Sequence, residues 1–94
     1  MKVRVWRYEV ADGARDEFEH EYGADGAWAK LFARSAGFVD TVLYAEVGSP
    51  GSYLTVDRFS SDAAWERFRV DHDTAYRALG ERLGHLTLAQ DEVV

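Results

Sequence analysis

The sequence lacks cysteine and asparagine, contains a single proline, and has no long apolar run. Without cysteine the chain forms no disulfide, zinc–thiolate site or iron–sulfur cluster, and it has no thiol nucleophile. No segment approaches the roughly 20 apolar residues that cross a bilayer. The first residues, Met1-Lys2-Val3-Arg4-Val5-Trp6-Arg7, become charged too early for a signal peptide. We therefore expect a soluble, cytoplasmic protein that has no membrane partner.

Basic residues are also scarce, since 11 lysines and arginines face 17 aspartates and glutamates, for a net charge of −6. An acidic domain repels phosphate backbones, so we expect no nucleic-acid partner. His20 and His85 share no metal-ligand spacing with His72, and no glycine-rich phosphate loop is present. The sequence therefore predicts neither a metal nor a bound cofactor.

What is present is typical of one folded domain. The 94 residues are 47% hydrophobic and 14% aromatic, which is enough apolar content to form a core. A second domain does not fit this length, so residues 1–94 are expected to fold as a single domain. A chain of this size buries only roughly 65% of its unfolded surface, and a partner subunit would add stability.

Hydrophobic periodicity predicts the order β-α-β-β-α-β. Residues 2–10 are expected to form a strand, and residues 14–35 one bent helix or two short ones. Strands over 38–47 and 53–59 are joined by a Ser-Pro-Gly-Ser turn, a helix follows from Ser61 to Leu83, and a last strand covers 86–94. This order is typical of the α+β, ferredoxin-like fold, in which four antiparallel strands carry two helices on one face.

Both faces of the predicted sheet are apolar. Alternation puts Phe38, Val42 and Tyr44 opposite Val39, Leu43, Ala45 and Val47, and it puts Tyr53, Thr55 and Phe59 opposite Leu54 and Val56. Two helices cover only one face, and a soluble monomer rarely exposes an apolar patch of this size. The sequence therefore predicts a homodimer in which two sheets pack face to face.

Several stretches resemble the antibiotic biosynthesis monooxygenase-like (ABM) family of the dimeric α/β barrel superfamily. They are residues 18–23 (FEHEYG), 26–32 (GAWAKLF), 37–39 (GFV) and 53–59 (YLTVDRF), followed by Ser61 and the helix that carries Trp65 and Phe68. The resemblance implies a sheet-to-sheet dimer, a dimeric α/β barrel with a cavity between each sheet and its helices. Some members oxidise polycyclic aromatic compounds with O2 and without metal or flavin, whereas others bind haem and open it.

His72 and Asp57 are the candidate catalytic bases. His72 belongs to the apolar stripe of the second helical region, so it is expected to point into the cavity. Because histidine titrates near neutrality, it could act there as a general base or as a haem ligand. A half-buried histidine that is hydrogen-bonded within the core is the alternative. Alternation turns Asp57 and Phe59 inward and Arg58 outward. An aspartate among aromatic side chains has a raised pKa and could abstract a proton, but the pattern favours the alternative, an ion pair with a strand arginine such as Arg7 or Arg4.

The high aromatic content favours a flat, apolar ligand. The candidate substrate-binding residues are Trp28, Phe32, Phe59, Trp65, Phe68 and Tyr76. The same residues have the spacing of core positions, so packing is the alternative for each of them.

The resemblance favours a cofactor-independent monooxygenase acting on a small aromatic or polyketide-like substrate. A non-catalytic dimer that binds a hydrophobic small molecule is the first alternative. A haem-binding or haem-degrading protein is the second. Related haem degraders use an asparagine, a tryptophan and a histidine, but this chain has no asparagine, and Phe59 occupies what looks like the tryptophan position.

Overall fold

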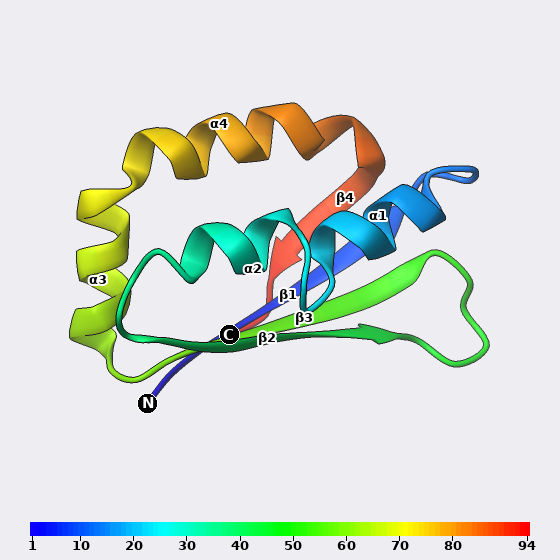
Figure 1. Ribbon diagram of the computed structural model, residues 1–94. Coiled ribbons are helices and arrows are strands. Elements are labelled where there is room, and N and C mark those ends of the chain that lie inside the picture. Colours follow the sequence, from blue (N-terminus) through cyan, green and yellow to red (C-terminus); the bar gives the residue numbers. More distant parts are fainter.

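One antiparallel sheet carries all the helices on one of its faces (Figure 1). The computed structural model describes residues 1–94. The strands are β1 (Lys2–Val10), β2 (Phe38–Ala45), β3 (Ser52–Phe59) and β4 (Thr87–Glu92), in the order β2-β3-β1-β4. The helices are α1 (Arg15–Tyr22), α2 (Ala27–Phe32), α3 (Asp62–Asp71) and α4 (Asp73–Leu83), and a 3-10 turn, η1 (Gly84–Leu86), leads into β4. The predicted ferredoxin-like α+β fold is confirmed.

The first helical region is two short helices, one of the two forms that the sequence allows. Gly23 ends α1 and Gly26 begins α2 in extended conformations. Gly26 lies so close to the end of α1 that an added Cβ would be 2.4 Å from the carbonyl oxygen of Glu21. This close approach fixes the bend between the two helices, and it requires a residue without a side chain.

The second helical region is not one helix, as the apolar stripe predicted. It breaks at His72, whose backbone (φ −128°, ψ 24°) separates α3 from α4. A straight helix over 62–83 would be about 33 Å long, nearly the full 36 Å length of the molecule. The break lets α3 stand at the end of the sheet while α4 runs back across it (Figure 1). Phe68 and Leu79 can therefore both reach the same core.

A β-bulge in β2 changes the predicted assignment of its faces. Phe38 pairs with Phe59 and Asp40 with Arg58, so Val39 is an extra residue in the ladder. Phe38 therefore packs on the helix side with Phe32 and Phe59, whereas the prediction placed it with Val42 and Tyr44. The alternation predicted for β3 is confirmed, because Tyr53, Thr55, Asp57 and Phe59 are all buried beneath the helices.

The other face of the sheet carries no helix. Its central row is Val42, Val56 and Val5, which the strand register places side by side. The next row adds Tyr44, which is 54% exposed, and Leu54. An ion pair between Asp40 and Arg58 borders this apolar patch.

None of the helices combines the length and the apolar character needed to cross a membrane.

Gly26→Ala is expected to lower the free energy of unfolding by about 1–3 kcal/mol, since the new methyl group overlaps the backbone of α1. Gly84→Ala is the matched control, because it is helical and an added Cβ there meets no atom within 4 Å. That change should be neutral or stabilise the protein by up to about 1 kcal/mol. Urea unfolding of both variants measures the difference. Equal stabilities would contradict the steric role of Gly26.

Candidate functional site

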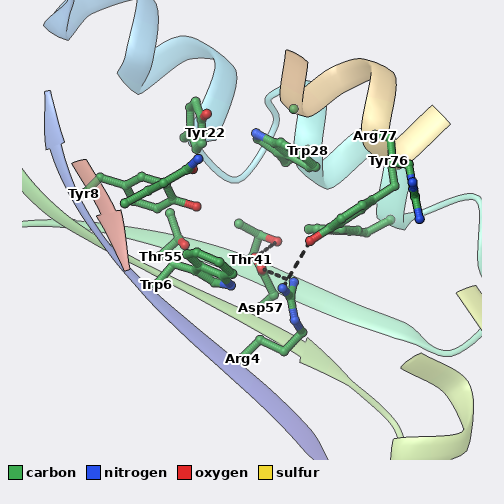
Figure 2. A pocket seen from close by; sticks show the side chains of 13 residues that line it. Arg4, Trp6, Tyr8, Tyr22, Trp28, Thr41, Thr55, Asp57, Tyr76 and Arg77 are labelled. Atoms are coloured by element: carbon green, nitrogen blue, oxygen red, sulfur yellow. Dashed lines mark hydrogen bonds and ion pairs between the residues drawn. The ribbon is translucent and has the colours of Figure 1, made fainter. Parts of the chain in front are cut away.

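A cavity of about 190 Å³ lies between the sheet and the helices (Figure 2). This volume exceeds the roughly 150 Å³ of engineered cavities that hold a benzene molecule, so an aromatic ring fits. The sheet supplies the floor and the helices supply the roof. The floor residues are Arg4, Trp6 and Tyr8 from β1, Thr41 from β2, Thr55 and Asp57 from β3, and Gln90 from β4. The roof residues are Tyr22 from α1, Trp28 and Phe32 from α2, and Tyr76, Arg77 and Gly80 from α4.

Arg4 and Asp57 form a buried ion pair on the floor. They are partners in the register of β1 and β3, so their side chains leave the same face of the sheet. Arg4 Nη1 is 3.4 Å from Asp57 Oδ2, and each residue is only 5% exposed. Thr41 donates a 2.8 Å hydrogen bond to Asp57 Oδ1, and Arg4 Nη2 donates a 3.3 Å bond to the hydroxyl of Tyr76 (Figure 2). One carboxylate and one guanidinium are thus held together beneath an aromatic roof.

Burial raises the pKa of Asp57 above its ordinary value of 3.8. The hydrogen bond from Thr41 and the charge of Arg4 act in the opposite direction, because both favour the ionised form, but desolvation is the larger effect. A carboxylate whose proton affinity is raised in this way is a better base than an exposed aspartate.

Tyr8, Tyr22 and Trp28 supply neutral hydrogen-bond donors to the pocket. Burial is the largest cause of the raised pKa of Tyr8 and of Tyr22, so both phenols keep their protons at neutral pH. The indole Nε1 of Trp28 is buried and has no hydrogen-bond partner. A buried donor without a partner is costly, and an acceptor on a bound molecule would satisfy it.

Four of the eight residues singled out from the sequence line the cavity, namely Asp57, Trp28, Phe32 and Tyr76. The expectation that His72 points into the cavity is not met, because the helix breaks there and its ring packs against Phe68 instead. Phe59, Phe68 and Trp65 also lie outside the lining. Phe59 and Phe68 are fully buried, and with Trp65 they form an aromatic cluster where α3 meets the sheet.

Arg4 is the principal residue whose place in the site was not foreseen. The sequence suggested it only as a partner for Asp57, although the period of two along β1 puts Arg4, Trp6 and Tyr8 on one face. A charged residue in line with two aromatic residues was therefore the available signal. Thr41 carried no such signal, because the bulge at Val39 decides which way it faces.

No three or more His, Asp or Glu side chains are arranged to hold a metal ion. The cavity lining contains no histidine, cysteine or methionine that would ligate haem iron. Of its three phenols, Tyr8 and Tyr22 have raised pKa values that favour the neutral form, which is the weaker ligand, and Tyr76 accepts a hydrogen bond from Arg4. A phenol is therefore the one type of side chain in this pocket that is known to ligate haem iron.

No protein-family model and no curated protein matches the sequence. Among solved structures, the chain is similar to SnoaB, a cofactor-independent oxygenase from Streptomyces nogalater, with 29% identity and a TM-score of 0.66 over 97% of this chain and 86% of that one. A protein from Nitrosomonas europaea, provisionally described as an antibiotic biosynthesis monooxygenase, has 8% identity and a TM-score of 0.66 over 99% of this chain and 94% of that one.

Two further structures have the same fold. MhuD, a haem degrader from Mycobacterium tuberculosis, has 22% identity and a TM-score of 0.64 over 97% of this chain and 89% of that one. A protein from Lactobacillus acidophilus, provisionally described as a monooxygenase, has 16% identity and a TM-score of 0.73 over 96% of this chain. The chain spans only 41% of that longer protein. The neighbours thus include both oxygenases and a haem degrader.

Thr41→Val is expected to raise the pKa of Asp57 further, because valine keeps the shape of threonine and donates no hydrogen bond to the carboxylate. Thr55→Val is the matched control, since Thr55 lies on the same floor and makes no hydrogen bond to Asp57. A ¹³C NMR titration of the Asp57 carboxyl measures both. An unchanged pKa in Thr41→Val would show that the bond does not act on the charge.

The raised pKa of Asp57 also makes the stability of the folded protein depend on pH. A carboxyl whose pKa is raised on folding stabilises the native state fully below its unfolded pKa, and this contribution is lost as pH rises through the folded pKa. In Thr41→Val that loss should extend to higher pH than in the wild type, which urea unfolding across the acidic range would detect.

Proposed function

Because the chain has the fold of the antibiotic biosynthesis monooxygenase-like family, as the resemblance of its sequence indicated, we propose that it is a cofactor-independent monooxygenase. Its substrate is a small aromatic or polyketide-like molecule that binds between the sheet and the helices. The observation that carries the proposal is a buried carboxylate, Asp57, in a cavity roofed by Trp28, Phe32 and Tyr76. The likeness to a cofactor-independent oxygenase supports the same reaction class.

Asp57 is the proposed base. It removes a proton from a methylene or hydroxyl group of the substrate and becomes a neutral carboxylic acid, a form that its burial favours. The resulting anion, a carbanion or a phenolate or enolate whose charge is shared with carbon, reduces O2 by forming a C–O bond, which gives a peroxide. The peroxide is protonated, the remaining C–H proton of the same carbon is lost, and the O–O bond breaks, which releases water and leaves a carbonyl. The substrate supplies all the electrons, so the balance needs no other reductant.

The aromatic walls of the cavity bind the substrate and exclude water. Trp28 and Phe32 from α2 and Tyr76 from α4 present ring faces and edges to a flat substrate. The unpartnered Nε1 of Trp28 donates to a carbonyl oxygen of the substrate. Exclusion of water by these aromatic groups strengthens the hydrogen bond from Trp28 and the interaction of the substrate with Asp57, and it protects the reactive anion.

Asp57→Asn should reduce O2 uptake with a model anthrone by about 100-fold or more, the usual contribution of a general base. His72→Ala is the comparison, since it removes the other predicted base from a position outside the cavity, and it should retain near-normal turnover. The wild-type rate should rise with pH as Asp57 loses its proton, and Asp57→Asn should lose this dependence. Loss of activity in His72→Ala alone would move the base from Asp57 to His72.

The same assay distinguishes the alternative functions. Saturable binding of the anthrone without O2 uptake would indicate a non-catalytic protein that binds hydrophobic molecules. A Soret band after titration with haemin, together with loss of the haem spectrum under a reductant and O2, would indicate a haem degrader and would contradict the proposal.

We also propose that the protein is a homodimer that pairs through the uncovered face of the sheet, as in a dimeric α/β barrel. The row of Val42, Val56 and Val5 supplies a continuous apolar centre, and Leu54 widens it. Burial of such a patch against its own copy is favourable by about 25 cal/mol for each Å² of apolar surface. Pairing on this face leaves the cavity on the other face of each sheet free for its ligand.

Val56→Glu should dissociate the dimer, because a two-fold axis would bring two buried carboxylates together at the centre of the interface. Val70→Glu is the matched control, since Val70 is 79% exposed on α3, on the helix side of the sheet. Sedimentation equilibrium at micromolar concentration should give about twice 10.6 kDa for the wild type and the control, and a monomer for Val56→Glu. A monomeric wild type would contradict the pairing.

A further inference from the structure

Arg4 is a buried cation whose hydrogen-bonding capacity is only partly used. A guanidinium carries five N–H donors. Arg4 makes two hydrogen bonds, 3.4 Å to Asp57 and 3.3 Å to Tyr76, and both are longer than the usual 2.9–3.0 Å. Glu92 Oε2 lies 3.9 Å away, which is too far for a hydrogen bond. The guanidinium can therefore donate a short hydrogen bond to a further oxygen.

Aromatic rings, more than polar partners, hold Arg4 in place. Its guanidinium carbon lies 3.9 Å from the ring centroid of Trp65 and 5.9 Å from that of Trp6. A guanidinium that lies over an indole has one flat face covered, while its N–H groups remain available at the edge. Asp57 and Tyr76 are contacted from this edge, and the same edge faces the cavity (Figure 2).

We propose that Arg4 binds the substrate oxygen that carries the negative charge after deprotonation by Asp57, and that the pocket therefore selects aromatic molecules with an acidic phenol or enol hydroxyl. The inference rests on the proposed function, because it assigns the substrate class of that same site. The hydroxyl donates to Asp57 and accepts from Arg4. When its O–H bond breaks, the proton moves to the carboxylate and the electron pair stays on the oxygen beside the guanidinium. Site and substrate together keep the same total charge.

The surrounding groups agree with this assignment. The other titratable side chains that face the pair are the phenols of Tyr8, Tyr22 and Tyr76, the guanidinium of Arg77, and the exposed carboxylate of Glu92. Arg77 is 72% exposed, at the solvent side of the pocket, and is paired with Asp73. Arg4 is therefore the one buried cation in the cavity, and a charge-assisted hydrogen bond to it is shielded from water.

Two probes that differ only in the acidic group test the inference. 4-Nitrophenol has an ionisable hydroxyl and a coloured phenolate, whereas 4-nitroanisole has a methoxy group in its place. Neither is oxidised by O2, so binding is measured apart from turnover. Wild-type protein should bind the phenolate at least tenfold more tightly than the anisole. The phenolate band of the bound probe should persist to lower pH than that of the free probe.

Two variants separate the effect of Arg4 on phenolate binding from the effect of Asp57. Asp57→Asn keeps the cation and removes the competing carboxylate, so it should bind the phenolate at least as tightly as the wild type. Arg4→Gln/Asp57→Asn removes both charges, leaves no unpaired buried ion, and should lose phenolate affinity by tenfold or more. Its affinity for 4-nitroanisole should change less than twofold. Arg67→Gln, which removes an exposed cation from α3, is the control for net charge and should behave as the wild type.

Equal phenolate affinities of Asp57→Asn and the double variant would overturn the role of Arg4. That result would not contradict the proposed oxygenase function, which the anthrone assay tests separately. Failure of the wild type to bind either probe would overturn both the inference and the proposed pocket. If the phenolate preference is found but no anthrone is oxidised, the assignment of Arg4 stands and the oxygenase function does not.

Discussion

The ion pair between Arg4 and Asp57 is the constraint around which the site is organised. Removing two charges from water is costly, and in a core of this size the loss is offset only if each charge has further partners. Asp57 has the hydroxyl of Thr41, and Arg4 has the ring of Trp65 and the hydroxyl of Tyr76. Three strands and two helices thus meet at one pair of charges. The long contacts of Arg4 show that the pair is not saturated by the protein itself.

The aromatic side chains have two different uses, and the position of the helices decides between them. Where α3 closes the end of the sheet, Phe59, Phe68 and Trp65 pack against one another and leave no cavity. Where α2 and α4 cross above the charged floor, Trp28 and Tyr76 cannot fill the space beneath them, and a cavity of about 190 Å³ remains. Polar groups at its base explain why apolar packing does not close it, since their donors and acceptors need partners.

One face of the sheet forms the floor of the cavity, and the other face is apolar and carries no helix. On one face, β1 and β3 carry the charges and phenols of the site, and the helices shield them. On the other face, the same strands present Val5, Leu54 and Val56 without cover. The period of two in each strand keeps these sets apart, so an interface on one side and a cavity on the other are compatible in 94 residues.

Local sequence pattern determined the order of the strands and helical regions, the β2–β3 hairpin, and the faces of β3, because strand periodicity depends only on neighbouring residues. It also determined that Asp57 turns inward beside Phe59, and it offered Arg4 or Arg7 as an ion-pair partner, of which the structure has Arg4. Tertiary structure decided the bulge at Val39 and the break at His72, which bring Thr41 into the site and take His72 out of it. The break at His72 fits the second helical region onto a molecule 36 Å long, and the bulge at Val39 depends on how β2 pairs with β3. A one-dimensional pattern records neither the fit nor the pairing.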